Sequence, residues 1–275
     1  MSDSLQTGQF YGQPRRRVEV AGVVLTEVLH QRGRKLPRHT HESAYFGLLL
    51  SGSYSESCTH RAAEYRPFTM GFHPASLTHS DEVGQCGSRM FCVELRNLYM
   101  DRTRSLLTAP QFVPDLCASE TTWLGLRLYR SFASETLNPL QVEELCGEML
   151  ERVACETVVG EKQTPAWFGR ALELLHESFR DALTLEGIAN LAGVHPIHLS
   201  RVFRQRHGCT MAEYINRLRV QSVCRALESG WVDLARLAAE SGFSDQSHMS
   251  RVFKSCTGQT PGRFRTFIHA NRASA

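Results

Sequence analysis

The sequence predicts an α+β protein of two domains: an antiparallel β-barrel or sandwich with following helices, then an all-α domain in which a helix joins two helix–turn–helix units. Three observations lead to this fold class. Short β-rich runs alternate with turn residues up to about residue 95. Apolar residues then recur at helical spacing from about residue 116. Finally, a short segment of the C-terminal part returns 50 residues later, and such a repeat constrains the architecture.

The N-terminal part is expected to begin with a flexible arm over residues 1–17, which carries three consecutive arginines from Arg15 to Arg17. The barrel is expected over residues 18–115. Its β-rich runs end at turn signals such as Ser51-Gly52-Ser53, which suits an antiparallel barrel or sandwich. The runs are Val20 to His30, Tyr45 to Leu50, Pro67 to Phe72 and Met90 to Leu95.

Two helices are expected over residues 116–157, because apolar side chains there follow a helical period, as in Leu145, Met149 and Val153. Residues 158–165 form the predicted linker, since this stretch is polar and contains Gly160 and Pro165. These helices could simply cover the barrel.

Composition excludes several classes of protein. With 42% hydrophobic and 21% charged residues, the chain is neither disordered nor collagen-like, and it has no apolar run long enough for a membrane span. The N-terminus does not resemble a secretory signal, which predicts a cytoplasmic location. The spacing of the nine cysteines shows no disulfide framework, which predicts reduced thiols. Residues 1–160 carry a net charge of −2 and residues 161–275 one of +5, which favours a polyanionic partner for the C-terminal part.

The internal repeat lies within the predicted C-terminal domain, residues 166–271. His198 to Arg204 returns as His248 to Lys254. In each copy the pattern predicts a helix, a tight turn and a second helix, with Gly193 ending the first helix of the first copy. The two units are expected at about 185–206 and 234–255.

The second helix of each unit presents a polar outer face. Leu199, Val202 and Phe203 share one face and must point inward. Outward residues rich in Arg and small polar groups suit a helix that lies in the DNA major groove, whereas a plain helical bundle with solvated arginines is the alternative. The outward residues are Ile197, His198, Ser200, Arg201 and Arg204 in the first copy, and Gln246, Ser247, His248, Ser250, Arg251 and Lys254 in the second.

Residues 167–266 resemble the DNA-binding domain of the AraC/XylS transcriptional regulators, most specifically in Gly242 to Lys254 and Gly258 to Pro261. In the first unit His195 stands where the family often has Ser, so weaker capping is expected there. The resemblance implies that Arg204, Arg206 and Lys254 bind phosphate. It implies base contacts by Ile197, Ser200, Arg201, Gln246, Ser247, Ser250 and Arg251.

The same resemblance implies a regulator that is not an enzyme and that activates rather than represses. Its implied partners are a double-stranded promoter or operator, RNA polymerase, a small-molecule effector and a second copy of the chain, with no membrane partner. It places dimerisation in the helices of residues 116–157.

Histidines in the N-terminal part form a second candidate site. His39 and His41 share one strand face, and His79 could complete a three-histidine set. The pattern partly resembles a cupin barrel, although Tyr45 or Phe46 stands where cupins have a glutamate ligand.

Three interpretations of this site stay open, and no cofactor is committed. His39, His41, Tyr45 and His79 could line an effector pocket. The three histidines could hold a transition metal for sensing or structure. They could also form the catalytic centre of a cupin-type metal-dependent enzyme fused to a DNA-binding module. His73, beside a proline, is expected to be structural or at the surface.

Overall fold

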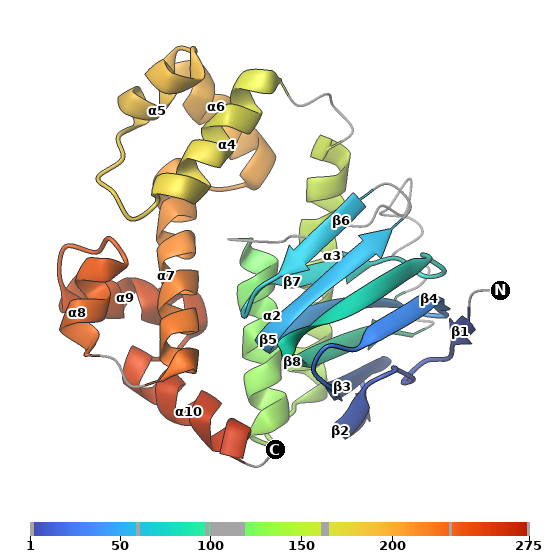
Figure 1. Ribbon diagram of the computed structural model, residues 1–275. Helices are drawn as coiled ribbons and strands as arrows, with labels where there is room; N and C mark the ends of the chain where they lie inside the picture. Colours follow the sequence, from blue (N-terminus) through green and yellow to red (C-terminus); the bar gives the residue numbers. More distant parts are fainter. Residues whose placement is uncertain are drawn as a thin grey trace. The chain divides into compact units, whose positions relative to one another are not determined.

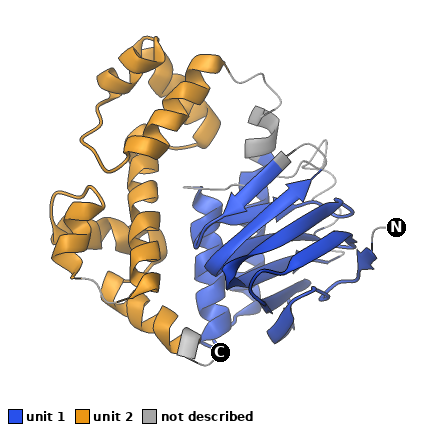
Figure 2. Cartoon of the chain, in the orientation of Figure 1, with its two compact units in different colours: residues 1–157 blue, residues 158–275 orange. Residues whose placement is uncertain are grey.

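The computed structural model describes residues 3–58, 61–96, 99, 119–160, 165–230 and 233–273. The chain divides into two compact units, Met1–Thr157 and Val158–Ala275, called here the N-terminal and the C-terminal unit (Figure 2). The first contains a sheet with helices and the second is helical, so the predicted α+β fold class is confirmed (Figure 1). Among the described residues no helix is both long and apolar enough to cross a membrane.

The described strands of the N-terminal unit form one curled sheet in the order β1-β4-β8-β3-β2, with β5 pairing β6, β7 and β8. Strand β8 organises the sheet, because its 17 residues pair antiparallel with β3, β4 and β5. The strands are β1 (Asp3–Leu5), β2 (Gln13–Val20), β3 (Val23–His30), β4 (Lys35–His41), β5 (Ala44–Cys58), β6 (Arg61–Tyr65), β7 (Met70–His73) and β8 (His79–Leu95).

The flexible arm expected over residues 1–17 is wrong. Strand β1 pairs in parallel with β4, and β2 already begins at Gln13 and pairs with β3. Between the two strands, the Gly8 N–H donates to both carboxylate oxygens of Glu94 at 2.9 Å. Arg15, expected in the arm, instead pairs with Glu27 at 3.3 Å. The sequence of β2 did not predict a strand before Val18, because its first residues are polar and largely exposed. Backbone pairing with β3, rather than burial of an apolar face, keeps them in the sheet.

Helices α2 (Glu120–Ala133) and α3 (Pro139–Gly160) follow the sheet within the segment predicted to be helical. Tyr129 and Phe132 of α2 pack on Phe91 of β8, with ring centroids 5.2 and 5.1 Å apart. Helix α2 therefore covers a face of the sheet. Because α3 reaches Gly160, the first three residues of the expected linker are helical; its residues 161–164, and residues 116–118, lie outside the described residues.

The C-terminal unit contains two helix pairs of the same kind. Gly193 and Gly242 follow the first helix of each pair with φ of 75° and 84°, a backbone conformation that disfavours other residues. The fully buried Ala189 and Ala238 lie in those first helices. The helices are α4 (Ala166–Ser178), α5 (Leu185–Ala192), α6 (Pro196–His207), α7 (Met211–Ser229), α8 (Leu234–Glu240), α9 (Gln246–Thr257) and α10 (Pro261–Ala273).

Candidate DNA-binding surface and buried histidine cluster

Helix α6 presents the outward residues that its period predicts. Leu199 and Phe203 are fully buried. Ile197, an apolar residue that is 73% exposed, lies on the opposite side of the helix. His198, Ser200, Arg201 and Arg204 are exposed as well.

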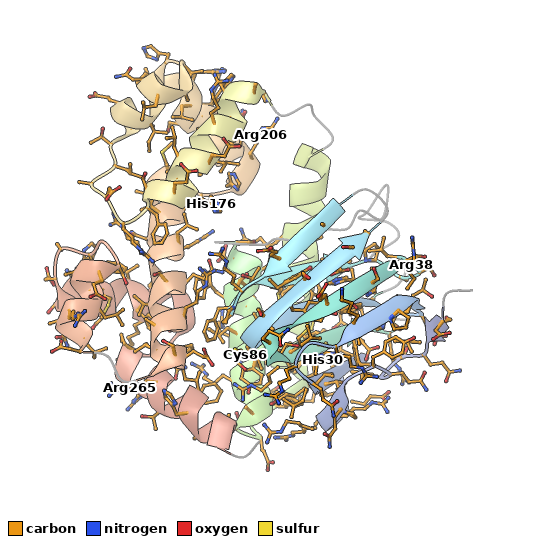
Figure 3. All side chains as sticks on the ribbon, in the orientation of Figure 1. His30, Arg38, Cys86, His176, Arg206 and Arg265 are labelled. Atoms are coloured by element: carbon orange, nitrogen blue, oxygen red, sulfur yellow. The ribbon has the colours of Figure 1, made fainter. Side chains whose placement is uncertain are left out.

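The outer face of α6 forms part of an open groove. Its lining includes Ile197, Arg201 and Arg204, together with Leu185 at the start of α5. The Arg201 side chain is held beside His198, with Nη2 3.2 Å from the ring Nδ1. Arg206, labelled in Figure 3, is by contrast half-buried. Its guanidinium carbon lies 5.2 Å from the centroid of the Phe168 ring.

Helix α9 carries the corresponding face of the second pair. Met249 and Phe253 are fully buried. Gln246, Ser247, Arg251 and Lys254 are exposed, whereas Ser250 and His248 are half-buried.

The two helices begin with different caps. At α9, Asp245 Oδ1 accepts the His248 N–H at 2.7 Å. The Ser244 hydroxyl also donates to Asp245, at 3.1 Å. The two hydrogen bonds, from the His248 backbone and from Ser244, hold the pKa of Asp245 below its ordinary value. At α6, His195 Nδ1 accepts the Ile197 N–H at 3.3 Å, so His195 does cap its helix, through a longer hydrogen bond.

The histidines His39, His41 and His79 lie together inside the N-terminal unit. Each is at most 3% exposed, and one ring nitrogen of each lies within 4.8 Å of the others. Tyr45, the fourth residue of the expected effector pocket, is also buried, with its ring 4.7 Å from that of His41.

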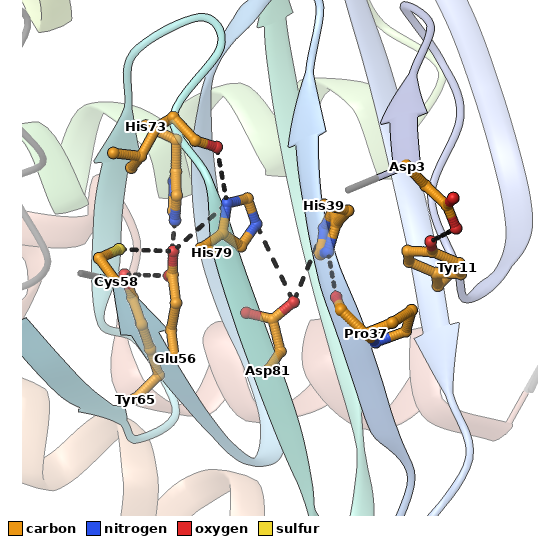
Figure 4. Close-up of polar contacts among 11 residues, drawn as sticks. Asp3, Tyr11, Pro37, His39, Glu56, Cys58, Tyr65, His73, His79 and Asp81 are labelled. Atoms are coloured by element: carbon orange, nitrogen blue, oxygen red, sulfur yellow. Dashed lines mark hydrogen bonds and ion pairs between the residues drawn. The ribbon is translucent and has the colours of Figure 1, made fainter. Parts of the chain in front are cut away.

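The buried residues Asp81, Glu56 and His73 also belong to this cluster; the sequence interpretation missed Asp81 and Glu56 and gave His73 no functional role. Asp81 Oδ2 lies 3.8 Å from His39 Nε2 and 3.9 Å from His79 Nε2 (Figure 4). Glu56 is 2.7 Å from His73 Nε2, and the His73 ring stacks on Tyr45 with centroids 4.2 Å apart. The structural alternative expected for His73 therefore fits, and the surface alternative does not. Asp81 could have been found, because it follows His79 by two residues and so shares its strand face.

Burial dominates the ionisation of the cluster. It lowers the pKa of His41 to about 2 and that of His79 to about 4, and it also lowers the pKa of His39. Burial and the neighbouring Glu56 raise the pKa of Asp81 to about 8. Burial alone would raise the pKa of Glu56, but the charge and hydrogen bond of His73 outweigh it and keep that pKa low. His39, His41 and His79 are thus neutral imidazoles with lone pairs to offer.

Aromatic residues of the N-terminal segment close the cluster. The Phe10 ring lies 5.2 Å from that of His41, and Tyr11 meets His39 edge-on at 5.0 Å. The cavity that these rings and Asp81 line has a volume of about 20 Å³. A pocket for an organic ligand is typically about 300 to 1,000 Å³, so this cavity fits a water molecule or an ion instead.

A helix–turn–helix family model matches residues 188–266. The probable transcription factor PqrA of Proteus vulgaris is 32% identical over 85 residues, which are 31% of this chain and 70% of PqrA. AdaA of Bacillus subtilis, a bifunctional transcriptional activator and DNA repair enzyme, is 32% identical over 36% of this chain. The arabinose operon regulatory protein of Salmonella typhimurium is 29% identical over 42% of it.

The matches cover 47% of AdaA and 42% of the arabinose regulator, so the chain spans less than half the length of these two relatives. The residues that the family model matches include α6, α8 and α9 in full and α5 from Ile188 onward. Taken with the two helix pairs of the C-terminal unit, these similarities establish that the chain belongs to the AraC/XylS family of transcriptional regulators.

Proposed function

We propose that the chain regulates transcription by sequence-specific binding to double-stranded DNA, with α6 and α9 lying in two successive major grooves. The observation that carries this proposal is the repetition of one surface. Each helix buries two apolar residues and presents a Ser-Arg pair, Ser200-Arg201 or Ser250-Arg251. On straight DNA the two helices would need centres about 34 Å apart, one turn of the duplex.

The exposed residues divide into base readers and phosphate binders. Arg201 and Arg251 have the fork geometry that recognises guanine, and Gln246 suits adenine. Ile197 offers an apolar surface for a thymine methyl group, and Ser200, Ser247 and Ser250 can hydrogen bond to base edges. Arg204 and Lys254 lie one helical turn further on and bind phosphate. His198 supports this face by holding Arg201.

We do not assign Arg206 to the phosphate binders, because its guanidinium packs over the Phe168 ring.

The N-terminal unit supplies regulation rather than catalysis in this proposal. A ligand of this unit would shift the population of states in which two chains occupy adjacent half-sites. Helices α2 and α3 would join two copies, and contact with RNA polymerase would make the protein an activator in the cytoplasm. The small cavity beside the histidines supports a role without turnover, because its volume of about 20 Å³ leaves no room for an organic substrate.

Selection from random-sequence DNA tests the DNA-binding proposal. The full chain should enrich a site with two separated sequence elements, and the Arg201→Ala/Arg251→Ala double variant should enrich none. Arg32→Ala/Arg66→Ala removes the same charge at two exposed positions of the N-terminal unit outside α2 and α3; it serves as the control and should leave the selected site unchanged. A folded wild-type chain that enriches no sequence would contradict the proposal.

A further inference from the structure

We propose that His39, His41, His79 and Asp81 bind one divalent transition-metal ion inside the N-terminal unit. This site concerns the sheet alone and does not depend on the DNA-binding proposal. Three features support this site: the strand register, the hydrogen bonds that orient the rings, and the buried polar atoms at its centre.

The register of two strands brings the four side chains to one face. His39 of β4 lies directly opposite His79 of β8. His41 follows His39 by two residues, and Asp81 follows His79 by two. Because side chains alternate along a strand, the members of each pair point to the same side. Two donors from each strand therefore converge.

Backbone carbonyls orient two of the rings. His39 Nδ1 lies 2.9 Å from the Pro37 carbonyl oxygen, and His79 Nδ1 lies 3.2 Å from that of Leu77. A neutral imidazole next to such an acceptor donates from Nδ1, which leaves the lone pair on Nε2. Both Nε2 atoms face the Asp81 carboxylate (Figure 4). A second ring nitrogen held by a carbonyl is the usual support of a metal-binding histidine.

Among the described residues, several polar atoms at the centre of the cluster lack a hydrogen bond of normal geometry, and Asp81 has only a weaker hydrogen-bonding contact with Tyr54. They are His79 Nε2, His41 Nδ1 and both carboxylate oxygens of Asp81. All three residues are at least 95% buried. Leaving such atoms unpaired is costly, about 1 to 3 kcal/mol each. All four atoms are electron-pair donors when the carboxyl is ionised, so one cation can satisfy them together.

Asp81, rather than Glu56, provides the carboxylate. The Glu56 oxygens are already engaged by His73 at 2.7 Å, Tyr65 at 3.2 Å and Cys58 at 3.7 Å. His79 Nδ1, which lies 3.9 Å from Glu56, is directed to Leu77. Glu56 therefore anchors β7 and β6 to β5, and Asp81 supplies the acidic ligand that the sequence pattern alone left missing.

The spacing and the donors indicate the class of metal. Metal bonds of about 2.0 to 2.2 Å hold two ligand atoms about 3 to 4 Å apart, which matches the 3.8 and 3.9 Å from Asp81 to the two histidines. The histidine nitrogens, within 4.8 Å of one another, need only small side-chain rotations to close. Imidazole with one carboxylate suits zinc, iron, cobalt or nickel rather than magnesium or calcium.

The experiment uses the full chain, freed of metal with a chelator and titrated with Co²⁺ or Zn²⁺ alone. We expect one ion per chain, a Co²⁺ absorption spectrum of nitrogen and oxygen ligands, and a higher Tm with metal. Asp81→Asn should weaken binding at least about 10-fold. Glu56→Gln makes the same carboxylate-to-amide change on β5, at the residue paired with Asp81 of β8. It should alter the metal affinity less than about 3-fold.

The outcomes separate the proposal from its rivals. A thiolate-to-cobalt band that disappears in Cys86→Ser would assign binding to that exposed thiol and overturn the site. A folded wild-type chain that retains no ion, or an Asp81→Asn variant that binds like wild type, would also overturn it. If circular dichroism shows Asp81→Asn to be unfolded, loss of the cobalt spectrum in His41→Gln supports the site and retention contradicts it. None of these measurements involves DNA.

Discussion

The first and second helix pairs of the C-terminal unit share one backbone plan but differ in the side chains that complete it. In the first pair, α6 is capped by a histidine ring and carries the exposed Ile197. In the second, α9 is capped by a carboxylate and carries the exposed Ser247 at the same place in the repeat. The comparison teaches that the buried residues preserve the unit, whereas the caps and outer faces are free to diverge. We expect the two helices to read different base sequences.

The largest effect should come from the residues that the two pairs share. Phe203 and Phe253 occupy the same place in the repeat and are both fully buried. Replacing either by Ala should lower the free energy of unfolding by about 3 to 5 kcal/mol. Urea denaturation of both variants checks whether the two cores are energetically equivalent. A loss below about 1 kcal/mol in one of them would show that its core can collapse around the cavity.

Acid between pH 6.5 and about 5 should affect the first pair alone, because the pKa of the Asp245 cap in the second pair lies below its ordinary value and that cap is lost only in stronger acid. His207 lies at the repeat position of Thr257, and its ring packs 4.6 Å from Phe203. Burial, together with the charges of His176, Arg206 and Arg217, lowers the pKa of His207 to about 4; Tyr214 also lies against its ring. Since an unfolded histidine titrates near 6.5, stability should fall as pH drops below about 6.5 and lose about 3 kcal/mol in all by pH 4.

Hydrogen-exchange protection of α6 and α9 at several pH values measures this difference. Between pH 6.5 and about 5, protection of α6 should decline, and that of α9 should not. His207→Thr, which copies the residue of the second pair, should remove the decline. Equal acid sensitivity of both helices would mean that another group controls it.

Single arginine and lysine changes sharpen the comparison on DNA. Arg251→Ala should cost about 1 to 3 kcal/mol of preference at the bases under α9 and leave the preference under α6 intact. Lys254→Ala should weaken binding to all sequences and reduce the salt slope by about one unit. Fluorescence anisotropy titrations at several salt concentrations distinguish the two. Uniform weakening by Arg251→Ala would assign that residue to the phosphate backbone.

The caps should give the smallest difference. Asp245→Ala removes a charged acceptor at 2.7 Å, whereas His195→Ala removes a neutral one at 3.3 Å. We expect the larger loss of stability for Asp245→Ala and a smaller loss, about 0.5 kcal/mol, for His195→Ala. Thermal unfolding checks the order, and a larger effect of His195→Ala would contradict it.

The C-terminal unit was predictable because its information is local. The helical period and the glycine after each first helix appear within a few residues of one another, and the repeat confirms each pattern with a second copy. The outward position of Arg201 or Gln246 follows from that period alone, and both are exposed in the structure. The half-buried position of Arg206 was not predictable, because Phe168 comes from another helix.

The N-terminal unit shows the opposite case. By itself the sequence determined that strands are present and that His39 and His41 share a face, since alternation is a property of one strand. Only the tertiary structure decided which residues meet them. Asp81, Glu56 and His73 come from β8, β5 and β7. Strand β1 pairs with β4, and the rings of Phe10 and Tyr11 pack against the histidines of β4. Strand pairing joins residues far apart in the chain, and no short pattern in the sequence records its register.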